Sequence, residues 1–148
     1  MLEYKLELIV LPVADVDRAK AFYNRIGFRE DLDYAAGEDF RVVHFTPPGS
    51  HCSIAIGNGI GTAAPGSVEN VHLIVRDIEK AREDLRGRGV EVSEIFHDAD
   101  GVFHHAGTEK REPGLYPGRL SYGSFASFSD PDGNGFLLQE ITERSPGR

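Results

Sequence analysis

The sequence predicts an α+β fold built from a doubled βαβββ module, and an internal repeat is the main reason. Residues 13–28 (VADVDRAKAFYNRIGF) align with residues 75–90 (VRDIEKAREDLRGRGV) at an offset of 62. A polar turn also repeats, because TPPGS at 46–50 aligns with DPDGN at 130–134 at an offset of 84. Each repeat starts with a short apolar segment, followed by a helical pattern and three further strand candidates. We therefore expect two modules, 1–60 and 67–143, within one compact domain.

Each module should contain one helix with recognisable ends. Asp15 and Asp77 stand where an N-terminal cap is expected, and Gly27 and Gly89 follow the last helical residues. The helices are expected near 15–26 and 77–88. Their apolar residues, including Phe22 and Tyr23, are read as core.

The strand candidates are short runs of apolar and β-branched residues bounded by turn residues. They are expected at 6–13, 28–34, 40–45 and 52–57 in the first module and at 70–77, 90–96, 122–128 and 135–141 in the second.

The difference between the two offsets means that the second module carries 22 extra residues. They fall within 97–120 (HDADGVFHHAGTEKREPGLYPGRL), which lacks periodicity and is rich in Gly, Pro and His. Irregular loops of this length are usually functional lids or disordered segments. The sequence leaves both alternatives open.

Composition excludes several classes of partner. With 24 acidic and 16 basic side chains, the net charge of −8 disfavours nucleic acid and anionic lipid as partners.

Neither a signal peptide nor an apolar stretch of membrane-spanning length is recognisable in the sequence. The single cysteine, Cys52, cannot form an intramolecular disulfide, which suggests a reducing compartment. We expect a cytoplasmic protein.

The doubled module, the segment LPVADVDRAKAFYNRIGF and the segment DPDGNGFLLQE together resemble the vicinal oxygen chelate superfamily. This superfamily includes glyoxalase I, extradiol dioxygenases, fosfomycin-resistance transferases and bleomycin-binding proteins. The resemblance covers nearly the whole chain and implies curved mixed sheets around a cleft. It also implies a homodimer, but it does not by itself imply a reaction.

In metal-dependent members, the resemblance places ligands on the first and last strands of each module. The matching positions here are Leu8, Ser53, Asn70 and Leu137. Leucine cannot ligate a metal, and Ser and Asn are weak ligands for zinc or iron, so no catalytic metal is predicted. A displacement by two residues would instead bring Val10, His72 and Gln139 together, which is the alternative metal site.

His72 is the candidate catalytic or anchoring residue, because the repeat places it on the cleft face of its strand. A histidine on such a face can act as acid, base or hydrogen-bond donor, or can simply be satisfied by a neighbour. Gln139 is expected on the cleft face as well, and Glu140 on the opposite face. Tyr122 is a candidate to stack on a planar ligand, beside Phe125.

His104 and His105 are adjacent in the insertion, next to Phe103. Neighbouring residues of an extended segment point in opposite directions, so at most one of the two is expected to enter the cleft. A lid role and a chance surface pair both remain open.

Two functions compete. The first is a protein that holds a small organic molecule in an apolar cleft without a catalytic metal, lined by the candidate ligand-binding residues Leu8, Val10, Ser53, Asn70, His72, His104, His105, Tyr122, Leu137 and Gln139. The second is a glyoxalase- or dioxygenase-type enzyme with a displaced metal. Metal-free acid–base catalysis by His72 lies between them. The sequence does not identify the ligand.

Overall fold

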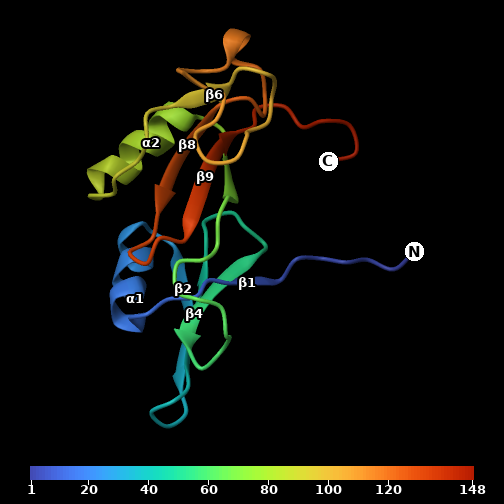
Figure 1. The fold of residues 1–148 in the computed structure, drawn as a ribbon. Coiled ribbons are helices and arrows are strands. Elements are labelled where there is room, and N and C mark those ends of the chain that lie inside the picture. The colour runs from blue at the N-terminus through green and yellow to red at the C-terminus, as the bar shows by residue number, and fades with distance from the viewer. The chain divides into compact units, whose positions relative to one another are not determined.

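The computed structural model describes residues 1–148, which divide into two compact units. Unit 1 comprises 1–69 together with the turn 129–134, and unit 2 comprises 70–128 and 135–148. Figure 1 labels the elements of each unit. The α+β class is confirmed, and the two units are consistent with two modules.

Unit 1 contains one helix and a four-stranded sheet in the order β1-β4-β3-β2. Strand β1 pairs with β4 in parallel, and the other pairs are antiparallel. The elements are β1 (Leu8–Val10), α1 (Val16–Arg25), β2 (Arg29–Ala35), β3 (Arg41–Thr46) and β4 (Ser53–Asn58).

Helix α1 begins and ends where the sequence predicts. The Asp15 side chain accepts a hydrogen bond from the backbone N–H of Arg18, and Gly27 follows the helix with a positive φ of 88°. Ala19, Phe22 and Tyr23 are buried, so the predicted core face is confirmed.

The turn 130–134 is closed by hydrogen bonds to Asp130. Its carboxylate accepts from the backbone N–H groups of Asp132 and Asn134 and from the Asn134 side chain. Asn134 also donates to the carbonyl oxygen of Pro12 at 2.8 Å. The turn therefore packs on the start of the chain as part of unit 1.

Unit 2 contains one α-helix and a five-stranded sheet in the order β5-β9-β8-β6-β7. Strand β5 pairs with β9 in parallel. The elements are β5 (Val71–Val75), α2 (Ile78–Gly87), β6 (Phe96–Asp98), β7 (Arg111–Pro113), the 3-10 helix η1 (Pro117–Arg119), β8 (Phe125–Ser129) and β9 (Gly135–Glu140).

The prediction of a strand over 90–96 is wrong for most of its length, because β6 begins only at Phe96. Around Ser93 the backbone does bond β8, since the Ser93 N–H donates to the Ser127 carbonyl. The returning bond, however, runs from the Ser127 N–H to the Ser93 hydroxyl. A side chain thus takes the place of a backbone acceptor and interrupts the ladder.

The insertion 97–120 has more regular structure than its sequence suggests. It contributes the end of β6 and all of β7, which pair from Phe96↔Pro113 to Asp98↔Arg111. The η1 turn lies in the insertion too. The insertion therefore extends the unit 2 sheet with regular structure.

The two modules differ in the register of their parallel strand pair. Leu8 lies opposite Ser53 in unit 1, and the repeat offsets would place Asn70 opposite Leu137 in unit 2. Instead His72 lies opposite Leu137. Asn70 precedes β5 and has a positive φ of 59°, so it does not belong to the ladder. The shift of two residues preserves the face of each side chain.

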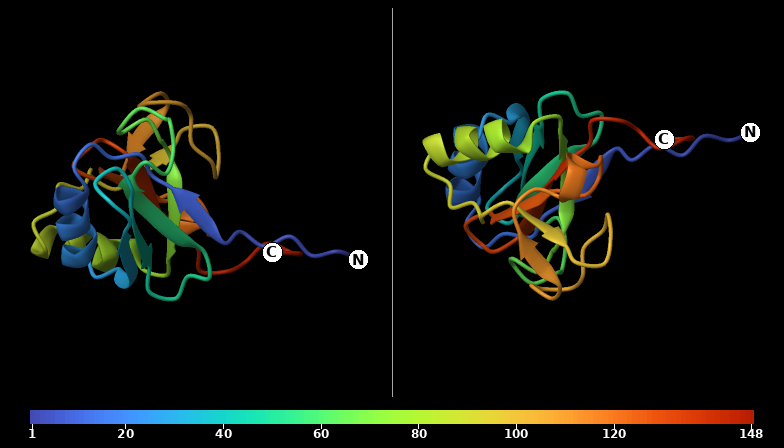
Figure 2. Two further views of the ribbon diagram at one scale, coloured as in Figure 1. Left: turned by 90° about the horizontal axis from the view of Figure 1, so that it is seen from below. Right: turned by 90° about the horizontal axis from the view of Figure 1, so that it is seen from above.

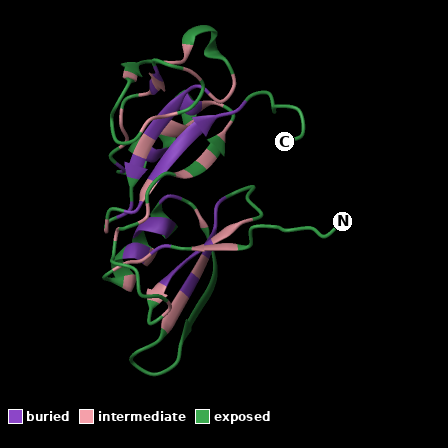
Figure 3. Cartoon of the chain, turned by 45° about the vertical axis from the view of Figure 1, so that its right-hand side comes forward, coloured by how far each residue is buried: buried purple, intermediate pink, exposed green.

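The core of unit 2 lies around β8 and β9. Phe96, Phe125 and Leu137 form one buried cluster, and Phe128 stacks on Phe136 with ring centroids 5.1 Å apart. In Figure 3 the central strands of unit 2 are buried, whereas β2 of unit 1 is exposed along its length. None of the helices combines the length and the apolar character needed to cross a membrane.

Candidate functional site

A hollow of about 580 Å³ lies on unit 2, on the face of the sheet opposite α2. We call it the unit 2 hollow. Its floor and sides come from β5, β8 and β9, and its remaining walls come from the insertion and the C-terminal segment. It is lined by His72, Ile74, Val102, Phe103, His104, Tyr122, Phe125, Gln139, Ile141, Arg144 and Arg148.

Strand alternation decides which side chains face the hollow. His72 and Ile74 are exposed on β5, whereas Val71, Leu73 and Val75 are half-buried on the other side. Because paired residues of neighbouring strands share a face, Gln139, opposite Ile74, also faces the hollow.

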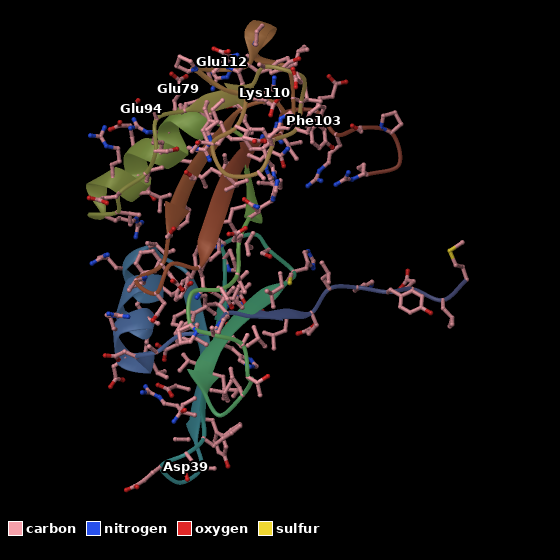
Figure 4. All side chains as sticks on the ribbon, viewed as in Figure 1. Asp39, Glu79, Glu94, Phe103, Lys110 and Glu112 are labelled. Carbon is pink, nitrogen blue, oxygen red and sulfur yellow. The ribbon has the colours of Figure 1, made fainter.

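Glu140 points the other way, as the alternation predicts. It is buried, and it accepts a hydrogen bond at 2.9 Å from the backbone N–H of Ile78, at the start of α2. Figure 2 shows α2 and the loop of the insertion on different sides of the unit 2 strands. In Figure 4, Phe103 correspondingly lies on the side away from Glu79 of α2.

Two histidines from distant segments meet in the hollow. The rings of His72 and His104 lie 5.2 Å apart between centroids, and each meets the ring of Phe125 edge-on, at 6.2 and 5.7 Å. Phe125 is fully buried. The two imidazoles therefore stand on an aromatic floor.

Both histidines are hydrogen-bonded to a backbone carbonyl oxygen through the same ring nitrogen, Nδ1. Nδ1 of His72 lies 2.9 Å from the Asn70 carbonyl oxygen, and Nδ1 of His104 lies 3.1 Å from that of His105. A carbonyl oxygen only accepts, so each Nδ1 carries a proton. Nε2 of each ring is the atom left to meet a ligand, as an acceptor when the imidazole is neutral and as a donor when it is charged.

Tyr122 lies at the rim of the hollow and accepts hydrogen bonds from two neighbouring segments. Its φ is +75°, a strained value for a side chain of this size, and its carbonyl oxygen accepts from the Gln139 side chain at 2.9 Å. Its hydroxyl accepts from the backbone N–H of Ser145 at 3.0 Å. That hydrogen bond, together with the nearby charges of Arg148 and Arg144, lowers the pKa of Tyr122.

The insertion is held against the sheet by an ion pair outside the hollow. Nδ1 of His105 lies 2.5 Å from the carboxylate of Asp98, which is buried, and Nε2 lies 3.6 Å from that of Asp100. The hydrogen bond to Asp98 raises the pKa of His105. His105 thus anchors the loop, and only His104 of the adjacent pair lines the hollow.

Three of the candidate residues lie in unit 1. Leu8 pairs in register with Ser53, whose hydroxyl lies 2.7 Å from that of Thr46. Val10 lines a different, more apolar hollow of about 330 Å³, formed with residues 57–63. Leu137 of unit 2 is buried in the cluster with Phe96 and Phe125 and does not line the unit 2 hollow.

The residues at the positions where metal-dependent relatives would carry ligands do not fit a metal. Leu8 and Leu137 are alkyl, and the Ser53 hydroxyl is already hydrogen-bonded to a neighbour. At the positions displaced by two residues, the Val10 side chain has no atom that can bind a metal, and the Gln139 amide is hydrogen-bonded to the carbonyl oxygen of Tyr122. A single imidazole, His72, falls short of the three ligands that such a centre needs.

Another group of possible ligands lies within the insertion. One ligand atom each from Asp98, Asp100 and His105 falls within 4.8 Å of the others. In the structure the imidazole lies 2.5 Å from one carboxylate and 3.6 Å from the other, and the same three groups are close enough together to hold a metal ion.

Several residues of the unit 2 hollow escape sequence reasoning. Ile74 carries a detectable signal, since it alternates with His72 on β5. Arg144 and Arg148 carry none, because they follow the last strand and no periodicity places them.

Comparison with known proteins supplies a family. A family model described as "Glyoxalase/Bleomycin resistance protein/Dioxygenase superfamily" matches residues 5–138. None of the curated proteins matches the chain.

Several solved structures resemble the whole chain. TnmS3, described as an antibiotic binding protein from Streptomyces sp. CB03234, is 27% identical with a TM-score of 0.68, over 95% of this chain and 98% of that one. A superfamily member from Sphaerobacter thermophilus DSM 20745 is 28% identical with a TM-score of 0.65, over 95% and 99% of the two chains. A mutant of the fosfomycin resistance protein FosX from Listeria monocytogenes is 16% identical with a TM-score of 0.60, over 95% of both chains, and shares the fold.

Proposed function

Because the chain belongs to the glyoxalase/bleomycin resistance protein/dioxygenase superfamily, we propose that it holds a small organic molecule in the unit 2 hollow without a catalytic metal. The observation that carries this proposal is the composition of the hollow. Five of its lining residues are apolar, Ile74 and Phe103 among them, and the other six carry polar groups: His72, His104, Tyr122, Gln139, Arg144 and Arg148. Ligand sites are typically hollows of about 300–1,000 Å³ with this mixture.

The resemblance to TnmS3 supports binding over transformation. That relative is described as an antibiotic binding protein, and it matches nearly the whole length of this chain. For this chain we correspondingly propose that the ligand is bound and released without chemical change. Its polar anchors are His72, His104 and Gln139.

One observation favours a second function, metal-free acid–base catalysis. His72 and His104 present two imidazoles with 5.2 Å between ring centroids, and in each ring Nδ1 is hydrogen-bonded to a carbonyl oxygen while Nε2 is left for a ligand. Such a pair can remove a proton at one point of a substrate and return it at another. Turnover of a bound compound, abolished in either His→Gln variant, would distinguish this function from simple binding.

The test is a calorimetric titration of the wild type and two matched variants with a planar aromatic compound, followed by mass spectrometry of the recovered compound. His72→Ala should weaken binding roughly tenfold, since it removes a ring contact and a hydrogen-bonding atom. His51→Ala is the control, because His51 is exposed in unit 1. Equal affinities of the two variants would contradict the assignment of the hollow.

Metal analysis completes the test. Affinity should be unchanged after dialysis against a chelator. Stoichiometric zinc, iron, nickel or manganese, lost together with binding or turnover, would refute the metal-free proposal and favour a lyase or oxygenase.

We further propose a cytoplasmic homodimer. The half-buried Cys52, which forms no disulfide, suits a reducing compartment, and closed dimers are the most frequent assembly among soluble homo-oligomers. A monomer mass that does not change with concentration in sedimentation would contradict the dimer.

A further inference from the structure

We infer that the ligand of the unit 2 hollow is a planar aromatic acid, whose carboxylate or phenolate faces Arg144 and Arg148. This inference rests on the proposed function, since it names the chemical class of the molecule that the same hollow would hold.

The lining of the hollow is basic although the chain as a whole is acidic. Acidic side chains outnumber basic ones by 24 to 16 in the chain, yet the lining includes two arginines, two histidines and no Asp or Glu. Glu140, the acidic residue on β9, faces α2 instead. A chain with net charge −8 thus presents a locally basic site, which attracts anions.

The two arginines of the hollow are not neutralised by a carboxylate side chain of the chain. Arg41 and Arg119, in contrast, each bind two or more carboxylates within the chain. Neither Arg144 nor Arg148 forms an ion pair, and the Arg148 guanidinium lies 5.9 Å from the centroid of the Tyr122 ring. Guanidinium groups bind carboxylates through paired, charge-assisted hydrogen bonds.

The aromatic surface of the hollow has a shape that suits a flat molecule. Phe125 forms the floor, and the side chain of Phe103, 52% exposed, lines the wall contributed by the insertion. The His72 and His104 rings are inclined to each other by only 37°. An aromatic ligand can contact the exposed Phe103 ring and the two imidazole rings by stacking or by edge-on packing.

A cationic ligand lacks a partner in this hollow. It would stand near two guanidinium groups, and no Asp or Glu side chain lines the site to offset them. Ring faces alone would have to hold it, which is a weaker attraction than a charge-assisted pair. The same lining therefore selects against aromatic amines.

The experiment uses three probes with one ring system: 2-naphthoate, 2-naphthamide and 2-naphthylmethylammonium. Each is titrated into the full chain at neutral pH and low salt. The naphthoate should bind about tenfold more tightly than the amide, because only it forms charge-assisted bonds, and the ammonium should bind most weakly.

Matched variants locate the effect. Arg144→Gln with Arg148→Gln should remove the advantage of the naphthoate and leave the amide affinity unchanged. Arg76→Gln with Lys110→Gln removes two positive charges elsewhere on unit 2 and should change none of the affinities. If the control variant weakens the naphthoate as much as the arginine variant, net charge alone accounts for the preference and the inference is overturned.

The outcomes separate this inference from the proposed function. Equal binding of the three probes, or a preference for the ammonium, would overturn the aromatic-acid inference while binding in the hollow stands. Inorganic phosphate that competes with the naphthoate and binds as tightly as it does would show a simple anion site, which overturns the aromatic part. Failure of all three probes to bind would count against both proposals.

Discussion

The Tyr23 hydroxyl donates a hydrogen bond of 2.8 Å to the carboxylate of Asp130, a residue 107 positions later in the sequence. Both side chains are buried within unit 1. Burial, and then the charge of Asp130, raise the pKa of Tyr23 well above its usual value, so the phenol stays a donor. The turn DPDGN therefore has a structural role in unit 1.

Tyr23→Phe should consequently destabilise the protein by about 1.5–3 kcal/mol, the usual range for a lost hydrogen bond to a charged group. The ring contacts with Phe22 and Phe45 are retained in this variant, so the loss isolates the hydroxyl. Chemical denaturation measures the change. Tyr34→Phe, whose ring is exposed on β2, is the control and should be neutral. Equal stability of Tyr23→Phe and wild type would show that the turn is held by its other bonds.

Glu140 should be needed for stability and not for ligand binding. Its carboxylate accepts from the Ile78 N–H and from Arg119 at 2.8 and 2.9 Å. Glu140→Gln removes the charge of a buried group and should cost roughly 2 kcal/mol. The exposed Glu143→Gln is the matched control. A loss of affinity without a loss of stability would place Glu140 in the site and contradict its assignment.

The His105–Asp98 pair should make stability depend on pH. The pKa of His105 is raised above its ordinary 6.5, first by the hydrogen bond to Asp98 and then by the charges of Asp98, Asp100 and Glu109. Its contribution is fully present below pH 6.5 and is lost as the pH rises through the raised value.

Asp98 limits the same contribution at acidic pH. Burial opposes its ionisation, but hydrogen bonds from His105 and from the Asp100 N–H outweigh burial and lower its pKa below 3.8. The difference in unfolding free energy between wild type and His105→Gln should therefore be greatest from about pH 4 to 6.5 and should shrink at alkaline pH. A difference that is independent of pH would show that the pair is not an ion pair in solution.

The sequence predicts those parts of the fold that depend on local rules. Asp15 and Asp77 cap helices because a short carboxylate reaches the third following N–H, and this is recognisable without tertiary contacts. The segment 90–96 was not predictable in this way, because the bond from Ser127 to the Ser93 hydroxyl depends on a residue 34 positions away.

The candidate site is predictable to a similar extent. Strand alternation identifies the face that carries His72 and Gln139, since a period of two is a local property. The convergence of His104, Arg144 and Arg148 on that face depends on the path of the insertion and of the C-terminal segment. Neither path has a periodic signal.

An NMR titration of the six histidine rings with 2-naphthoate, each ring assigned by its own His→Gln variant, shows most directly whether the unit 2 hollow is the ligand site. We predict that the signals of His72 and His104 shift and saturate with one affinity, while those of His44, His51 and His97 stay in place. Shifts confined to the histidines outside the unit 2 hollow, or saturable binding that moves none of the six, would contradict this assignment.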